Sequence, residues 1–236
     1  MARAPRPTPR QATIFINKLE AARRQLDAAL RMTLANEDEL AIHTVAAAAY
    51  RILRDMLHKR GRHDLEDLFR SGLLGMAKKF IEGELSKDEL IKWQLYDLVS
   101  LVAKFMKIHG EDVKVEDVPL FLHESSKKAH WQAMSGVSGF LKHADRLPEG
   151  MISLQDVNND MLIFHACAAY TMVSRVDTCE MHFYHLFWCA AEPGRSEELS
   201  TIDIEIVDFL KALSPSRRRR VCMKLIRRCK KDGDLP

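Results

Sequence analysis

The fold is decided by Leu40-Ala-Ile-His-Thr-Val-Ala-Ala-Ala-Ala-Tyr-Arg-Ile-Leu-Arg-Asp-Met-Leu57. Its apolar residues recur at the three- and four-residue spacing that places them on one face of an α-helix. The alanines at 46–49 are small enough to let another helix approach closely. Asn36–Asp38 precedes the stretch as a cap, and Gly61 follows it as a stop signal. We therefore predict a helix that ends near Arg60.

Helical patterns continue on both sides of this segment. A first helix is expected after a cap at Thr13, and a shorter helix or two over Asp64–Lys79. Ser86-Lys-Asp-Glu89 matches a capping box and predicts a helix through Met106 that stops at Gly110. Further helices, separated by loops at 111–124 and 148–158, are predicted over Ser126–Arg146, Asn159–Arg175, Cys179–Ala191, Ser196–Leu213 and Ser214–Lys231. Because no segment has the period-two alternation of a strand, we predict an all-α helical bundle of about seven or eight helices without a sheet.

Composition divides the chain into three parts. Residues 1–10 are rich in Pro and Arg and are expected to form a disordered basic arm. Residues 11–213 would form the helical-bundle domain, since a chain of 236 residues that is 47% hydrophobic can bury a sizeable core. Residues 214–236 would add a basic amphipathic helix and tail, begun by Ser214-Pro215 as cap and first helical residue.

The five cysteines, at 167, 179, 189, 222 and 229, are odd in number. The N-terminus lacks the hydrophobic segment of a secretory signal, and no apolar run approaches the length of a membrane span. A cytoplasmic location with free thiols is therefore the expectation. We expect no cofactor, and the sequence leaves a homo-oligomer open.

Charge is sorted along the chain. Residues 1–10 carry three Arg and no acid, and residues 215–236 carry nine Lys and Arg against two Asp. Residues 11–214 hold 24 basic and 31 acidic side chains, so their net charge is −7 although the whole chain has +3. An acidic body with basic ends favours a polyanionic partner, such as nucleic acid or a membrane surface.

The terminal helix carries most of these cations. Its apolar residues form one narrow stripe that can dock on the body or on another chain: Val221, Cys222, Leu225, Ile226 and Cys229. The other faces hold the candidate nucleic-acid-binding residues Arg217, Arg218, Arg219, Arg220, Lys224, Arg227 and Arg228. Free cations neutralise phosphates and release counterions. The alternative is a solvated face whose charges pair with the acidic body.

A second candidate site is Gly139-Phe-Leu-Lys-His-Ala-Asp-Arg146. Within it, Lys142, His143 and Asp145 are candidate catalytic residues, because a histidine can act as acid or base near neutral pH and a cation can hold a phosphate. The alternative is a polar helix end before Pro148, since the segment brings no nucleophile.

Helical spacing gathers Cys179, His182, His185 and Cys189 within about a third of a helix circumference. His182, His185 and Cys189 are candidate zinc ligands if neighbouring helices supply further ligands. The alternative is a set of buried structural side chains, because the intervening residues are aromatic. His43, beside the alanine run, is expected to hydrogen-bond a neighbouring helix.

Two segments together resemble a group of uncharacterised bacterial all-helical proteins: IHTVAAAAYRIL at 42–53 and FLKHAD at 140–145. Members of the group read close to IHTLA-x-AA-Y-x-IL and N-F-F-K-H-A-D, so this chain departs at Val45, Gly139 and Leu141. The likeness covers about residues 15–190 and implies no particular activity.

Arg175 and His182 are similar in spacing to the HEPN class of helical RNases and nucleotide-binding modules, in which four to six residues separate Arg from His. That resemblance implies RNase chemistry on this pair. The same spacing recurs at Arg51 and His58, and Val176 stands where the class prefers a polar residue.

These observations predict a binding or interaction protein without enzymatic activity, with nucleic acid as its ligand. Two alternatives stay open. One is a HEPN-like RNase that uses Arg175 and His182, or His143 with Lys142. The other is a metal-binding bundle around His182, His185 and Cys189. Convergence of the histidines in one pocket would favour an enzyme or a metal site.

Overall fold

A computed structural model describes residues 15–61, 64–92, 95–110, 113–114, 117–118, 136–143, 149–191 and 199–232. In these ranges the chain is all-helical, with ten helices of defined bounds and no strand, which confirms the predicted fold class. The helices are α1 (Lys18–Ala35), α2 (Glu39–Lys59), α3 (Asp64–Ile81), α4 (Lys87–Lys92), α5 (Tyr96–His109), the 3-10 helix η2 (Leu154–Asp156), α7 (Asn159–Ser174), α8 (Cys179–Ala191), α9 (Thr201–Lys211) and α10 (Pro215–Asp232). Residues 136–142 are also helical.

The count exceeds the seven or eight helices expected, and two local features explain the excess. The helix predicted from the capping box through Met106 is divided, because α4 ends at Lys92 and α5 begins after Leu95. The break lets Leu90, Leu95 and Val99 all enter one core, which a straight helix would not allow. The predicted loop at 148–158 also contains the single turn η2.

Capping side chains set several boundaries. The side chain of Asp38 accepts a hydrogen bond from the backbone N–H of Ala41 at the start of α2, and Gly61 follows its end with φ 64°. The capping box at α4 is confirmed, because Ser86 and Glu89 each accept from the other's backbone N–H. The cap of α1 is Asn17 rather than Thr13, whose position lies outside the described residues.

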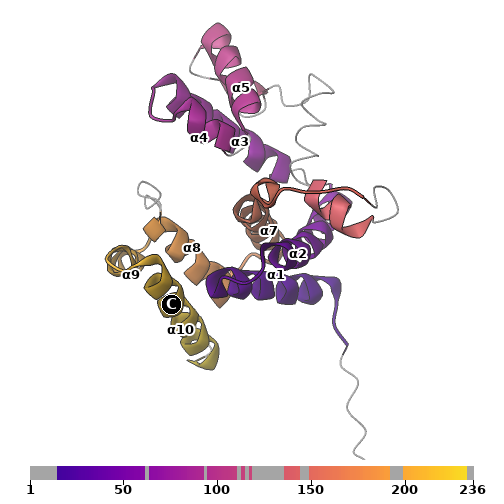
Figure 1. Cartoon of the computed structure of the whole chain (residues 1–236), viewed down its shortest axis with the longest axis vertical. Helices are drawn as coiled ribbons and strands as arrows, with labels where there is room; N and C mark the ends of the chain where they lie inside the picture. Colours follow the sequence, from indigo (N-terminus) through magenta and orange to yellow (C-terminus); the bar gives the residue numbers. More distant parts are fainter. Residues whose placement is uncertain are drawn as a thin grey trace, which may run out of the picture.

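The buried side chains form two separate clusters. The first joins α1, α2, α7, α8, α9 and α10, and the second joins α3, α4 and α5. In Figure 1, α3–α5 lie at one end of the molecule, while α8, α9 and α10 lie beside the central α1, α2 and α7. The terminal helix α10 therefore belongs to the first core, where it contacts α1, α8 and α9.

The alanine run of α2 allows other helices to approach closely, as its small side chains predicted. Ala46 and Ala49 are fully buried, as are Ala22 in α1 and Ala166 in α7. Small residues on facing helices let the helix axes approach closely, so α2 packs against α1 and α7 together.

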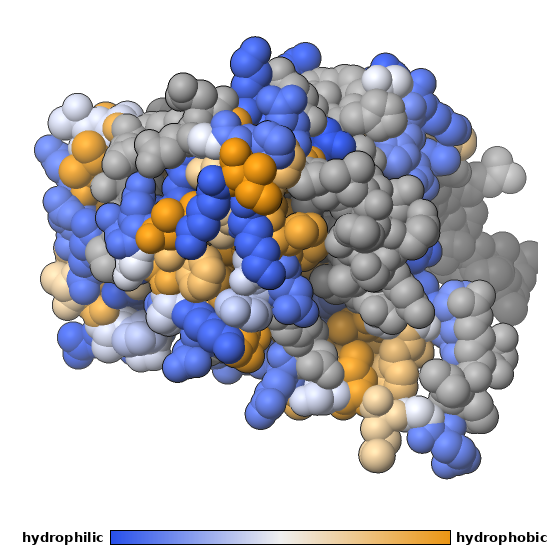
Figure 2. Space-filling model, turned by 90° about the horizontal axis from the view of Figure 1, so that it is seen from above, coloured by the Kyte–Doolittle hydropathy of each residue, from blue (hydrophilic) through white to orange (hydrophobic). Residues whose placement is uncertain are grey.

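The end of the molecule formed by α3–α5 faces the viewer in Figure 2, where apolar groups lie between polar ones. Ile81, Ile91 and Ile108 of these helices are among the large apolar side chains that stay exposed. No described helix has the length and apolar character needed to cross a membrane.

Candidate functional site

The basic terminal helix α10 is docked on the body by its apolar stripe. Ser214 precedes Pro215 at its start, and the N–H of Arg218 donates to the carbonyl oxygen of Ser214 at 2.9 Å. Cys222, Ile226 and Cys229 are buried in the first core. The opposite side of α10 is therefore held toward solvent.

The solvent side of α10 is a continuous cationic face. Its members are the exposed residues Arg217, Arg220, Lys224, Arg227, Arg228 and Lys231. At about 100° per residue, these six cations occupy an arc of only about 100° around the helix. At a rise of about 1.5 Å per residue they extend over about 21 Å. We call this set the cationic face; within the described residues no acidic side chain lies on this side of α10.

Two of the predicted nucleic-acid-binding residues do not belong to the cationic face. Arg218 is half-buried, and its Nε donates to the carbonyl oxygen of Leu210 at 3.1 Å, where it caps the end of α9. Arg219 is also half-buried. Arg218 and Arg219 lie on a different side of the helix from Arg217 and Arg220. The run of four arginines in the sequence does not by itself show which of them face solvent.

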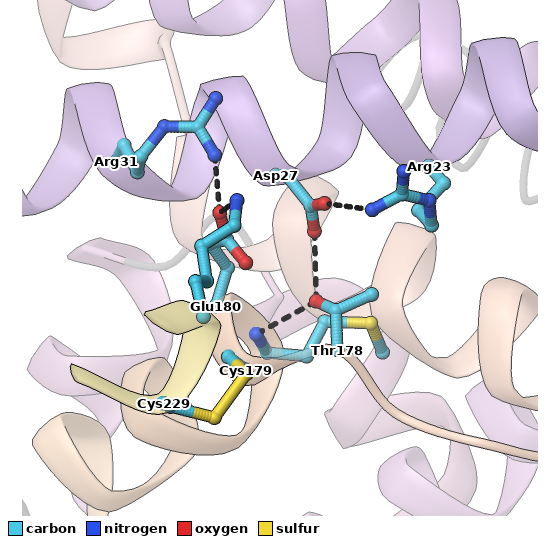
Figure 3. The surroundings of a disulfide bond; sticks show 9 residues. Arg23, Asp27, Arg31, Thr178, Cys179, Glu180 and Cys229 are labelled. Carbon is cyan, nitrogen blue, oxygen red and sulfur yellow. Dashed lines mark hydrogen bonds and ion pairs between the residues drawn. A yellow bond between two sulfur atoms is a disulfide. The ribbon is translucent and has the colours of Figure 1, made fainter. Parts of the chain in front are cut away.

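A buried carboxylate anchors the other end of α10 (Figure 3). Glu180 of α8 is 1% exposed, yet it accepts hydrogen bonds from Arg31 of α1 and Lys230 of α10. Both cations keep part of their surface in water, so only the carboxylate is fully desolvated. Such a group is tolerated in a core only while its cations stay in place.

A second buried carboxylate lies at the same junction. Asp27 of α1 accepts from Arg23 at 3.1 Å and from the hydroxyl of Thr178 at 2.7 Å. Burial raises the pKa of Asp27, the Thr178 hydroxyl opposes this, and the nearby Glu180 raises it further. The junction of α1, α8 and α10 thus holds two acids between three cations.

The expectation of free thiols is wrong for two of the five cysteines. Cys179 of α8 and Cys229 of α10 form a disulfide close to Glu180 (Figure 3). The two cysteines are separated by 50 residues in the sequence, and only the fold brings them together. Cys167, Cys189 and Cys222 form no disulfide.

A different polar cluster surrounds His43 of α2, which we call the His43 cluster. Its ring Nε2 lies 3.2 Å from Oγ of Ser138, in the helical residues 136–142, and Nδ1 lies 3.1 Å from Oδ1 of Asn159 in α7. His43 and Ser138 are only 3% and 4% exposed. Burial lowers the pKa of His43, and the Lys142 ammonium lowers it further, against the opposing hydrogen bond to Asn159.

The His43 cluster joins the two segments that carry the bacterial resemblance, because residues 136–142 run into the predicted Lys142–Asp145 site. Lys142 is exposed, and burial of its stem together with Arg51 lowers the pKa of its ammonium. His143 is half-buried just after this helical stretch, and Asp145 lies outside the described residues.

The candidates on α7 and α8 lie in different surroundings. Nε2 of His182 lies 3.2 Å from Oδ1 of Asp203 in α9. Arg175 ends α7 in the left-handed conformation, with φ 68°, and its side chain is exposed. His185 is exposed whereas Cys189 is buried. The described ranges contain no group of three or more His, Cys, Asp or Glu side chains placed to hold a metal ion.

The histidines therefore have separate partners: His43 contacts Ser138 and Asn159, His182 contacts Asp203, and His165 contacts the carbonyl oxygen of Met161. Sequence reasoning found His43 but missed Ser138, Asn159 and Glu180. Of these three residues, only Glu180 could have been noticed in the sequence, because it is an acidic residue in the otherwise apolar and aromatic segment of α8.

The buried histidines predict a dependence of stability on pH. Burial lowers the pKa of His43 and of His165 below the ordinary value of 6.5. The folded protein keeps both rings neutral while the unfolded chain binds protons, so stability is complete above about pH 6.5 and falls as the pH drops toward the folded pKa. Each histidine contributes a slope of at most about 1.4 kcal/mol per pH unit.

Urea unfolding measured between about pH 7.5 and pH 5 tests this expectation. The His43→Gln variant should lose part of the slope, whereas His109→Gln, at an exposed position, should keep the slope of the original protein. The shift of Asp27 is common to all three proteins and cancels in the comparison. Equal slopes for His43→Gln and the original protein would contradict the assignment.

Comparisons with known proteins found no matching family model, no matching curated protein and no matching solved structure. The resemblance of 42–53 and 140–145 to bacterial proteins, and that of Arg175 and His182 to the HEPN class, therefore stay predictions.

Proposed function

We propose that the protein binds nucleic acid through the cationic face of α10. The observation that carries the proposal is the placement of six cations on the outward side of a helix whose other side is buried in the core. Because α10 is already ordered by docking, binding does not have to fold it, and the entropic cost of association is reduced accordingly.

Five of the six charges of the cationic face are available for a ligand. Among the described residues, no ion pair or side-chain hydrogen bond involves Arg217, Arg220, Lys224, Arg227 or Lys231, whereas Lys230 is engaged with Glu180. Self-neutralisation by the acidic body, the alternative considered from sequence, therefore accounts for Lys230 but not for these five. Uncompensated cations in a row favour a polyanion through counterion release.

The chemistry of the cationic face favours backbone contacts over base recognition. Arg and Lys bind phosphates, but α10 has no aromatic side chain on which an unpaired base could stack. Duplex nucleic acid presents phosphates along a rigid path, which suits a straight row about 21 Å long. We therefore expect binding with little sequence preference and strong dependence on salt.

The test neutralises the cationic face and measures binding to a generic duplex by fluorescence anisotropy at several salt concentrations. If all six cations contact phosphates, the slope of log K against log salt is about −5. The variant with Arg217, Arg220, Lys224 and Arg227 changed to Gln should bind weakly and flatten this slope by about 3 to 4.

A matched control removes the same four charges elsewhere, by changing Lys78, Lys79, Lys104 and Lys107 of α3 and α5 to Gln; all four are exposed. This control should bind nearly as well as the original protein. Equal losses in both variants would attribute binding to net charge alone, and absence of binding at low salt would refute the proposal. Binding to vesicles of anionic lipid but not to duplex would assign the face to a membrane surface instead.

The RNase and metal alternatives have no comparable support. Arg175 makes no side-chain hydrogen bond or ion pair among the described residues. Its partner in the HEPN-like pair, His182, instead contacts Asp203. The cytoplasmic location also stays a prediction, and the disulfide makes the redox state a condition to control in every binding experiment.

A further inference from the structure

We propose that Ser138, His43 and Asn159 form a nucleophilic site for acyl transfer, whose substrates are esters that carry an anionic group near the reacting carbonyl. This activity is separate from the binding proposed for α10. The three residues come from residues 136–142, from α2 and from α7, so the fold assembles a nucleophile, a base and an orienting group that no single segment contains.

The hydrogen bonds of Asn159 decide the state of the histidine. Its Nδ2 donates to the carbonyl oxygen of Glu39 at 2.9 Å, so the amide is oriented and its Oδ1 is turned toward Nδ1 of His43. An oxygen without hydrogen can only accept, so Nδ1 carries the ring proton. Nε2 is then an acceptor, and the partner that donates to it is the hydroxyl of Ser138.

This arrangement is the one that activates a serine. A nucleophile requires a base within hydrogen-bond reach and a third group that orients the base, which describes Ser138, His43 and Asn159 in turn. The base must also be neutral before the reaction, and burial of His43 together with the cation of Lys142 favours the neutral ring.

The class of substrate follows from the charges beside the cluster. Lys142 stands four residues after Ser138 and therefore shares its helix face, and Arg51 of α2 is close enough to lower the pKa of the Lys142 ammonium. Both side chains are exposed, whereas Ser138 is buried. Two neighbouring cations at the solvent edge favour a carboxylate or phosphate on the substrate.

The reaction is balanced without a cofactor. Oγ of Ser138 bonds to the carbonyl carbon of the ester while its proton passes to Nε2 of His43. The tetrahedral adduct then expels the alcohol, which takes that proton, and leaves an acyl group on Ser138. Water attacks the acyl group by the same proton transfers, releases the carboxylic acid and restores the serine.

The experiment treats the full-length protein with a small fluorophosphonate and measures the labelling rate of each serine by peptide mass spectrometry. Ser153, which is exposed and caps η2, is the internal control. We expect Ser138 to react at least about 100-fold faster than Ser153, the factor that general-base assistance typically provides. Labelling of Ser138 no faster than Ser153 would overturn the proposal and leave the cluster as a packing network.

Two variants test the roles of the partners. His43→Gln should abolish the fast labelling of Ser138, while unchanged circular dichroism shows that the fold is retained. Asn159→Leu removes the oxygen that accepts from Nδ1 of His43 and should lose the fast labelling. Fast labelling that persists in His43→Gln overturns the relay, and if that variant does not fold, the comparison of Ser138 with Ser153 in the original protein decides.

The substrate class is tested by hydrolysis of two 4-nitrophenyl esters, the neutral acetate and the anionic hemisuccinate. The original protein should prefer the hemisuccinate in kcat/KM. Lys142→Ala should reduce the ratio of the two kcat/KM values, hemisuccinate over acetate, about ten-fold, as expected for loss of one ion pair. No preference between the esters in the original protein would overturn the assignment of an anionic substrate.

Discussion

Reduction of the disulfide between Cys179 and Cys229 is expected to lower the free energy of unfolding by about 4 kcal/mol. The bond closes a loop of 50 residues between α8 and α10, and the unfolded chain gains the corresponding entropy once the loop is opened. This amounts to a large share of the stability of a typical domain, which is about 5 to 15 kcal/mol. Opening the bond also removes the covalent link between α10 and α8.

Urea unfolding with and without dithiothreitol measures this effect. The double variant with Cys179 and Cys229 changed to Ser should resemble the reduced protein and should not respond to dithiothreitol. Cys222→Ala is the matched control, because it removes a free thiol from the same helix and should leave the response to dithiothreitol intact. A response smaller than about 1 kcal/mol in the original protein would mean that the bond contributes little to stability in solution.

Removal of both cations from Glu180 is the second change with a large expected effect. In the variant with Arg31 and Lys230 changed to Met, the carboxylate stays buried without a partner. An uncompensated buried charge costs about 3 to 5 kcal/mol. Urea or thermal unfolding at neutral pH gives the loss directly.

The decisive comparison adds Glu180→Met to the same variant. Once the carboxylate is absent, no buried charge remains, so the triple variant should recover most of the lost stability. Changing Arg24 and Lys211 to Met removes two cations from exposed pairs and should cost at most about 1 kcal/mol. If the triple variant were as unstable as the double variant, the loss would come from packing of the Arg31 and Lys230 stems and not from the buried charge.

The disulfide and the Glu180 pair act on the same helix but through different physics. The disulfide restricts the unfolded chain, whereas the ion pairs satisfy a desolvated carboxylate in the folded state. Because both hold the C-terminal half of α10, they position the cationic face relative to the body. Docking of α10 and the proposed binding of nucleic acid are therefore linked, and the stability of the junction sets how rigid that binding surface is.

Local signals in the sequence predicted most helices well. Helical periodicity with capping residues placed α2 and α8, and Ser214-Pro215 placed the start of α10. These features depend on neighbours within four residues, so they can be read without knowledge of the fold. The division between α4 and α5 was missed because it depends on how Leu90 and Leu95 reach a shared core, which is a tertiary requirement.

The functional candidates also divide into features that are visible in the sequence and features that depend on the fold. The abundance of cations near the C-terminus is visible in the sequence, but the removal of Arg218 from the cationic face follows from its contact with the end of α9. Likewise, His43 was recognisable beside the alanine run, whereas its pairing with Ser138 spans 95 residues. Pairs this distant along the chain leave no periodic pattern.

By itself, the sequence determined the all-helical class, the start of the terminal helix and the sorting of charge into an acidic body and basic ends. All three depend on composition and short-range spacing. The tertiary structure alone decided that α10 docks by its apolar stripe, that Cys179 pairs with Cys229, that Glu180 is buried between two cations, and that Ser138 lies within hydrogen-bond distance of His43. The reason is physical: burial and long-range contacts exist only once helices far apart in the chain pack against one another.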